Sequence, residues 1–157
     1  MKPIFLHSPN GLFRQTIYWP LFLFSKYMRG GLSISVSLTG PVFRGETLPA
    51  WISIIKGPPS VLDASAVLHT AEDGVKSLRV AVVNRSETEQ YTAPLRVAFF
   101  EVSGREIEVH ELWHPDTKAR NTWGQEDEVS IRTYKARWRG KWTFREHSFT
   151  MLIIYLS

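Results

Sequence analysis

The chain has 157 residues, enough for one domain of ordinary size, and its 43% hydrophobic and 22% charged residues are typical of a globular protein rather than a disordered one. The net charge of +4 is small and spread along the chain, so no nucleic-acid partner is expected. The absence of cysteine excludes disulfides, thiolate metal sites and a cysteine nucleophile.

Residues 11–30, GLFRQTIYWPLFLFSKYMRG, form an apolar segment near the start of the chain. As a helix it has no clean polar face, which is typical of a helix covered on more than one side. Pro20 predicts a kink or a fresh helical turn, and Gly30 predicts the helix end. Polar residues interrupt the segment, so no membrane span is expected. Residues 1–15 lack the long apolar region and the small-residue cleavage site of a signal peptide, so none is expected there, and localisation stays open.

The hydrophobic pattern changes to an alternation with period two after residues 29–31, which predicts strands. In residues 32–38 the apolar positions alternate with three serines, as in a half-buried strand. Further strands are expected within residues 60–69, 77–86, 93–102, 106–114, 129–138 and 142–156. Seven or eight short strands at regular spacing predict an antiparallel β-sandwich. The predicted fold class is therefore mainly β, an antiparallel sandwich preceded by an N-terminal helix.

Residues 134–147, YKARWRGKWTFREH, interleave basic and aromatic side chains. One interpretation is a stacking platform for single-stranded nucleic acid or sugar. The other is a β-hairpin with its turn at Gly140, in which Tyr134, Ala136 and Trp138 share one face. The hairpin is favoured, because strand alternation alone explains the interleaving.

Candidate chemical groups are sparse. His110 and His114 would lie roughly 13 Å apart along a strand, too far for one metal ion, so surface histidines and no metal site are expected. The acidic groups at 106/108 and 126–128 favour a solvated edge, since a glycosidase pair must face across a cleft at about 5–9 Å. Asn84 begins an N-glycosylation sequon, which matters only if the chain is secreted. No catalytic residue and no cofactor are assigned.

Taken in order, six segments are similar to the carboxyl-terminal region of fungal-type α-L-arabinofuranosidases, which are retaining glycoside hydrolases. The resemblance runs from about residue 4 to residue 152, nearly the whole chain. The segments are GLFRQTIYWPLFLFSKYMRG, ETLPAWI, LDASAVL, LRVAVVNRS, VHELWHPDTKARNTWGQEDEVS and WTFREHSFTML.

The resemblance implies that a (β/α)₈ barrel carries the catalysis and that a jelly-roll β-sandwich follows it. Residues 1–30 would then be the last strand and helix segment of a barrel that is missing here, and residues 31–157 the C-terminal sandwich. The family's nucleophile and acid/base glutamates belong to earlier barrel strands, so the chain alone is expected to be non-catalytic. Gln15, in the RQT motif, would contact substrate, and only with a complete barrel.

The implied parent enzyme hydrolyses terminal non-reducing α-L-arabinofuranosyl residues in arabinose-containing polysaccharides. Two alternatives stay open. One is a freestanding carbohydrate-binding module that uses Trp51, Trp113 or Trp123, although packing of these residues under loops is favoured. The other is a non-functional truncated paralogue, whose exposed N-terminal helix would cause homo-oligomerisation. The start at a barrel's end and the apolar ending IIYLS indicate a fragment, a truncated paralogue or an imperfect gene model.

Overall fold

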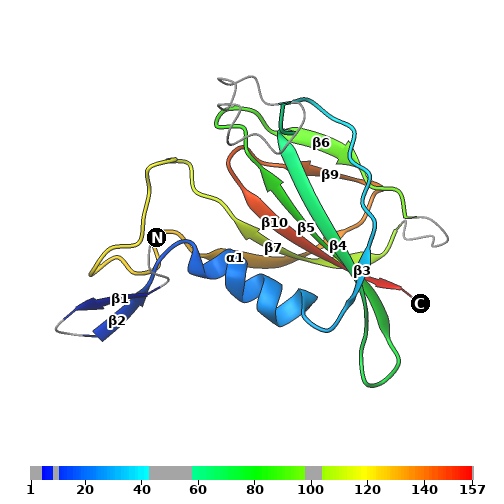
Figure 1. The fold of residues 1–157 in the computed structure, drawn as a ribbon, viewed down its shortest axis with the longest axis horizontal. Helices are drawn as coiled ribbons and strands as arrows, with labels where there is room; N and C mark the ends of the chain where they lie inside the picture. Colours follow the sequence, from blue (N-terminus) through cyan, green and yellow to red (C-terminus); the bar gives the residue numbers. More distant parts are fainter. Residues whose placement is uncertain (1–4, 9–10, 43–57, 98–103, 157) are drawn as a thin grey trace, which may run out of the picture.

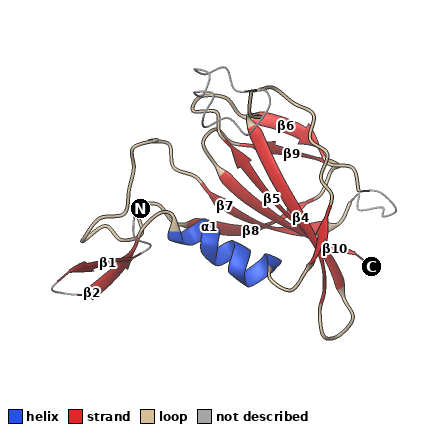
Figure 2. Cartoon of the chain, in the orientation of Figure 1, coloured by secondary structure: helices blue, strands red, loops and turns tan. Residues whose placement is uncertain are grey.

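A computed structural model describes residues 5–8, 11–42, 58–97 and 104–156. Its centre is a six-stranded antiparallel sheet in the order β3-β4-β5-β10-β7-β8, and β6 pairs with β9 in a second layer (Figure 1, Figure 2). The sheet strands are β3 (Leu32–Ile34), β4 (Leu62–Thr70), β5 (Lys76–Asn84), β10 (Phe149–Leu156), β7 (Glu106–Leu112) and β8 (Ile131–Arg137). The second layer consists of β6 (Tyr91–Pro94) and β9 (Lys141–Phe144). The predicted class, an antiparallel β-sandwich preceded by a helix, is confirmed.

Strand β10 is the centre of the fold, since it pairs with β5 on one side and β7 on the other. Its sequence FTMLIIYL is apolar on both faces, as expected for a strand covered on both sides. Leu152 and Ile154 point into a core shared with the second layer. Phe149 and Met151 point the other way, into a smaller core shared with the N-terminal helix.

The helix lies across this second face of the sheet (Figure 1). It consists of α1 (Tyr18–Leu23) and a π-helical continuation, η1 (Phe24–Met28). Pro20 stands in the first turn, where its missing N–H costs no helical hydrogen bond. Gly30 follows the helix with φ +77°, so the predicted helix stop is confirmed. Gly31 then passes so close to β4 that an added Cβ would lie 2.9 Å from the Val67 side chain.

The predicted helix over residues 11–30 was wrong at its start. Strand β1 (Phe5–Ser8) pairs with β2 (Gly11–Arg14) in an antiparallel hairpin before α1 begins at Tyr18. Two features explain the late start: Gly11 has φ +137°, which a right-handed helix excludes, and Pro20 fits only near a helix beginning.

The predicted strand over residues 32–38 was also too long, and its apolar residues do not form a buried face. β3 pairs with β4 over three residues at the sheet edge. The exposed fractions are 68% for Leu32, 36% for Ile34, 40% for Val36 and 37% for Leu38. Beyond β3 the segment borders an open cavity of about 560 Å³ between the sheet and residues 93–97. The described residues therefore leave this strip of apolar side chains without a full cover.

The predicted hairpin at Gly140 does not form. β8 pairs with β7 in the large sheet, whereas β9 pairs with β6 in the second layer. Between them Trp138 is buried, and its backbone bonds to Gly104 and Arg105. The alternation itself is confirmed, since Tyr134, Ala136 and Trp138 all pack on the core between the layers. The chain therefore crosses from one sheet to the other where a tight turn was expected.

Some predictions lie outside the described residues: those for Trp51, for the segment ETLPAWI and for the strand region 98–102. Within the described ranges, no helix has the length and apolar character needed to cross a membrane.

Candidate functional site

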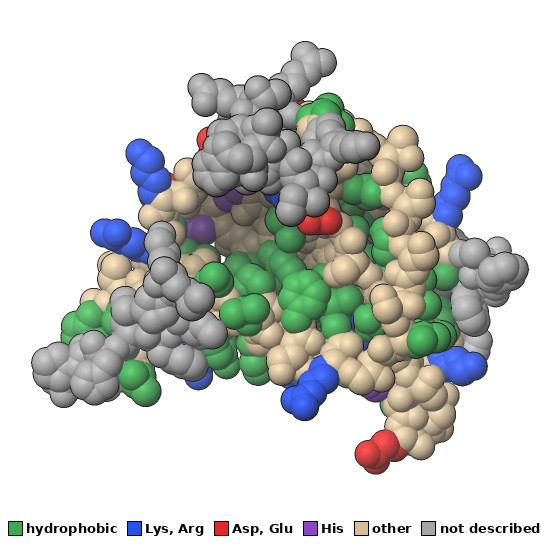
Figure 3. All heavy atoms as spheres, viewed as in Figure 1, with side chains coloured by type: hydrophobic (Ala, Val, Ile, Leu, Met, Phe, Trp, Pro, Cys, Tyr) green, Lys and Arg blue, Asp and Glu red, His purple; other side chains and the backbone are tan. Residues whose placement is uncertain are grey.

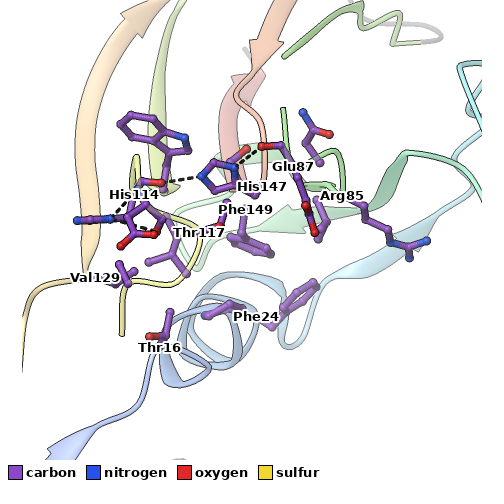
Figure 4. A pocket seen from close by; sticks show the side chains of 17 residues that line it. Thr16, Phe24, Arg85, Glu87, His114, Thr117, Val129, His147 and Phe149 are labelled. Atoms are coloured by element: carbon purple, nitrogen blue, oxygen red, sulfur yellow. Dashed lines mark hydrogen bonds between the residues drawn. The ribbon is translucent and has the colours of Figure 1, made fainter. Parts of the chain in front are cut away.

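An open cavity of about 570 Å³ lies between the N-terminal helix and one end of the large sheet (Figure 4). Thr16, Pro20 and Phe24 line it from the helix side. Its other walls are the loop after β5, the loop after β7 and the segment leading into β10. The residues from these walls are Val83, Asn84, Arg85, Glu87, Leu112, Trp113, His114, Asp116, Thr117, Ala119, Val129, His147, Ser148 and Phe149.

Asn84 joins two of these walls. Its side chain is 1% exposed, and its amide nitrogen donates to the backbone oxygens of Glu89 and Arg145 at 2.8 Å and of Phe144 at 3.3 Å. Its side-chain oxygen accepts a bond of 2.9 Å from the N–H of Ser86. Asn84 is also the sequon residue. A glycan on this nitrogen would have to displace these bonds from a buried site, so the folded chain does not present the Asn84 amide to solvent.

His147 joins three loops and has a strained backbone, with φ +39°. Its N–H donates to Ser86 O at 2.6 Å. Its ring nitrogens lie against two further carbonyl oxygens, Nδ1 at 3.2 Å from Glu87 and Nε2 at 2.6 Å from His114 (Figure 4). Each ring nitrogen thus lies beside a backbone oxygen of a different loop, and the ring N–H donates to one of these oxygens according to the tautomer.

Trp113 is half-buried in the same region. The Arg145 guanidinium lies 4.3 Å from its ring centroid, and the His147 ring lies 6.3 Å away at an interplanar angle of 22°. The interpretation that this tryptophan packs under loops is confirmed. For Trp123 the same interpretation was wrong: its side chain is 47% exposed and meets Phe13 edge to face at 6.3 Å.

The acidic groups considered from sequence do not line this cavity. Glu106 pairs with Lys135 at 2.6 Å on the surface, and a Glu126 oxygen accepts from the N–H of Gly124 at 2.9 Å. The cavity wall carries Glu87 and Asp116, and Asp116 accepts from the N–H of Lys118 at 2.8 Å. The Glu126 and Asp116 bonds stabilise local turns, and the Glu106–Lys135 pair is a surface ion pair, so each has a structural role.

His110 was predicted at the surface, and this was wrong: it is 4% exposed. Its Nδ1 lies 2.9 Å from Thr133 Oγ1 and its Nε2 lies 2.8 Å from a Glu108 oxygen. Its ring centroid lies 4.6 Å from that of Tyr27, with the two planes tilted by 32°. Burial lowers its pKa, and Lys26 lowers it further against the opposing effect of Glu108. His114 is half-buried, 3.3 Å from a Glu128 oxygen. The described residues contain no group of three His, Asp or Glu side chains placed to hold a metal ion.

Gln15 lies outside this cavity, in the turn that begins the helix. Its backbone oxygen accepts a 2.9 Å bond from the N–H of Tyr18, and its side chain is half-buried. Beside it, Asn121 donates from its side chain to Arg14 O at 3.2 Å. Sequence reasoning missed Asn84, Asn121 and His147 as organising residues. Their only local sign was a polar residue near apolar runs, and their partners lie far away in the chain.

The outer side of α1 and the residue before it carry an apolar patch, defined here as Ile17, Leu21 and Phe22 with exposed fractions of 50%, 48% and 36%. Figure 3 shows hydrophobic side chains gathered in the middle of the face that carries α1. Leu23, on the inner side, is 1% exposed. The helix therefore covers the sheet with one side and presents a second apolar side outward.

Residues 1–148 match the family model described as the alpha-L-arabinofuranosidase C-terminal domain. The chain is 38% identical over 151 residues to a probable alpha-L-arabinofuranosidase C of Aspergillus niger, and 35% identical over 145 residues to the alpha-L-arabinofuranosidase C of Emericella nidulans. Both matches cover 92% of this chain, which spans 26% of the length of each relative.

The fold is similar to that of solved arabinofuranosidases. For the enzyme of Thermotoga maritima in its arabinose complex, the TM-score is 0.77 at 22% identity, over 97% of this chain and 31% of the other. For the GH51 enzyme of Thermotoga petrophila the TM-score is 0.74 at 22% identity, over the same shares. At this identity the similarity concerns the fold alone.

Proposed function

Because the chain belongs to the family of α-L-arabinofuranosidase C-terminal domains, we propose that it serves as the non-catalytic C-terminal domain of such an enzyme. The enzyme would hydrolyse terminal non-reducing α-L-arabinofuranosyl residues in arabinose-containing polysaccharides. The curated relatives are named as arabinofuranosidases, and the chain spans about a quarter of their length. In a retaining glycosidase, two carboxylates about 5–5.5 Å apart form and then hydrolyse a covalent glycosyl intermediate. We assign that carboxylate pair to the part of the enzyme that lies outside this domain, about three quarters of the relatives' length.

The single structural observation that carries this proposal is the two-sided helix. A helix with one buried and one exposed apolar side is stable when a second body covers the exposed side. The proposed cover is the catalytic part of the enzyme, because the relatives extend well beyond the length matched here. Residues 1–30 would then be the last strand and helix segment of a (β/α)₈ barrel, and residues 31–157 the sandwich that supports it.

The sandwich would provide a rigid surface on which α1 packs. Leu23 packs into a cluster with Met151 and Phe149 of the central strand, so the position of α1 is set by the best-buried strand of the sheet. A last barrel helix held in this way would fix the chain just before it, including Gln15, the residue proposed to contact the arabinofuranosyl unit. Substrate would reach this chain only through the complete enzyme.

A domain replacement tests the proposal. The C-terminal region of the Aspergillus niger relative is exchanged for residues 1–157, and turnover of 4-nitrophenyl α-L-arabinofuranoside is measured for the chimaera, for the relative's catalytic part alone and for this chain alone. We expect turnover by the chimaera and none by this chain. Turnover by this chain alone, lost on changing one of its own residues, would overturn the non-catalytic role. A soluble chimaera without turnover, beside an active parent, would overturn the proposed partnership.

The unoccupied outer patch of α1 also favours association between copies of this chain in the absence of a catalytic partner. Sedimentation velocity of the chain alone tests this point. Oligomers that dissociate in Leu21→Asp support it, and a monomer at high concentration argues against it.

A further inference from the structure

The two ends of the loop from Asn121 to Val129 are joined by hydrogen bonds from the Asn121 side chain to the Val129 backbone. Asn121 is 2% exposed. Its Nδ2 donates to Val129 O at 3.0 Å, while its Oδ1 accepts from the N–H of Val129 at 2.7 Å. Within the loop, Thr122 and Gln125 exchange two backbone bonds, and Gly124 takes φ +82°. A buried amide that uses both its donor and its acceptor in this way makes the loop rigid.

The same loop holds the N-terminal segment at two points. Asn121 Nδ2 also donates to Arg14 O at 3.2 Å, and Trp19 Nε1 donates to Val129 O at 3.1 Å. The bonded residues are 107 and 110 positions apart in the chain. Gln15 lies between the two attachment points, and its own carbonyl accepts the N–H of Tyr18 at 2.9 Å. Hydrogen bonds to this loop of the sandwich therefore hold the chain both before Gln15, at Arg14, and after it, at Trp19.

Packing supports the same two attachment points. Arg14 Cζ lies 5.3 Å from the Tyr18 ring centroid and 5.4 Å from that of Trp19, so the side chain before Gln15 is held over the first helical turn. Phe13 is 8% exposed and meets Trp123 of the loop. Val129 and Trp19 belong to the same apolar cluster as Leu23. Loop and segment thus form one packed unit.

We propose that Asn121 is a positioning residue, which acts through the Arg14 carbonyl to hold Gln15 in the orientation that the catalytic site uses. This inference rests on the proposed function, in which Gln15 contacts the sugar. It adds a specific role for the sandwich: a side chain of the C-terminal domain sets the backbone of a substrate-contacting residue. A misplacement of about 1 Å at such a residue can cost about 10²-fold in rate.

The attachment is tested first on the 157-residue chain by hydrogen exchange. Asn121→Asp keeps the shape and the oxygen that accepts from Val129, but it removes both donors and places a carboxylate against two carbonyl oxygens. We expect exchange of the Tyr18 and Trp19 amides to become roughly tenfold faster, the equivalent of one hydrogen bond of ordinary strength. Trp19→Phe, which removes the indole N–H and part of the ring's packing, should also speed exchange in the same peptides and keeps the test open if Asn121→Asp does not fold.

Asn84→Asp is the matched control, because Asn84 is also a buried asparagine bonded to backbone carbonyls. It should speed exchange around residues 84–89 and 144–148 and leave residues 14–19 unchanged. Unchanged exchange at residues 14–19 in both Asn121→Asp and Trp19→Phe would overturn the attachment.

The second arm measures kcat/KM of the chimaera. Asn121→Asp should lower it about 10²-fold, and the double variant with Gln15→Ala should be no worse than Gln15→Ala alone. Thr92→Val, which removes a bond of 2.7 Å to Thr143 in the second layer, should leave it unchanged. Additive losses would overturn the positioning role. If Gln15→Ala has no effect while exchange at residues 14–19 rises in Asn121→Asp, the substrate contact fails and the attachment stands.

Discussion

The two faces of the six-stranded sheet are covered in different ways. Among the residues that the structure describes, twelve buried side chains form one apolar cluster on the face towards β6 and β9, and this cluster includes Trp138. On the face towards α1 the described residues give a cluster of six buried side chains. Polar groups lie beside it: Arg79 donates to Tyr27 O, and the His110 ring contacts the Tyr27 ring. The smaller cluster supports a helix whose outer side is apolar and exposed.

This difference separates the face that holds most of the buried core from the face that carries the helix. The face towards the second layer has the larger apolar cluster, although a cavity stays open beside residues 93–97, so it should determine the stability of the isolated chain. The helix face carries the segment that the proposed function places against the catalytic part. Its stability should therefore depend on what covers the outer patch of α1.

The largest effect is expected on the face that carries the larger cluster. Trp138 is 1% exposed and stacks on Trp142 with ring centroids 6.5 Å apart. Trp138→Ala should lower the free energy of unfolding of the isolated chain by about 3–5 kcal/mol, the usual range for loss of a buried aromatic side chain. Urea unfolding followed by circular dichroism measures this. Trp123→Ala, at a 47% exposed position with one aromatic partner, should lower it by only about 0.5–1.5 kcal/mol. Equal losses in the two variants would contradict the assignment of the core.

A smaller loss is expected beneath the helix. Leu23→Ala removes the one fully buried side chain of α1 and should cost about 2–3 kcal/mol in the isolated chain, at the low end for a core leucine because the helix is short and partly exposed. Leu21→Ala, 48% exposed on the outer side, is the control and should be nearly neutral. If Leu21→Ala cost as much as Leu23→Ala, the outer side would already be covered in the isolated chain.

The smallest effect is a pH dependence confined to the helix face. Burial holds the pKa of His110 below its ordinary value of 6.5 in the folded chain. The unfolded chain therefore takes up the proton first, and the stability due to this residue is complete above pH 6.5 and is lost as the pH falls from 6.5 towards the lower folded pKa. His110→Gln, which does not titrate, should show a shallower fall in urea midpoint over that window. An identical fall in both proteins would assign the dependence to other groups.

The pattern of the sequence was sufficient for the features that are local. Alternation showed which side chains of β8 share a face, and Gly30 marked the helix end. The same pattern does not show which strands pair with each other. Alternation is the same whether β9 pairs with β8 or with β6, so the crossing at Gly140 was not predictable from it.

The candidate site was harder to predict, because its organising residues depend on distant partners. Asn121 bonds to Arg14 across 107 positions, and Asn84 bonds to Arg145 across 61. His110 is buried because Tyr27 and Thr133 reach it from other elements. A lone Asn or His in a sequence carries no sign of such partners. The family was indicated by the resemblance of six segments that occur in the same order along the chain.

The most direct test of the account is to change the outer patch of α1 in two settings. Leu21→Asp and the matched Leu32→Asp, both at exposed leucines, are each made in the isolated chain and in the chimaera with the Aspergillus niger catalytic part. Thermal unfolding and soluble yield are then compared. We expect Leu21→Asp to be tolerated in the isolated chain but to lower strongly the melting temperature or the yield of the chimaera, while Leu32→Asp has little effect in either. A chimaera that tolerates Leu21→Asp as well as Leu32→Asp would contradict the claim that this helix joins the sandwich to a catalytic domain.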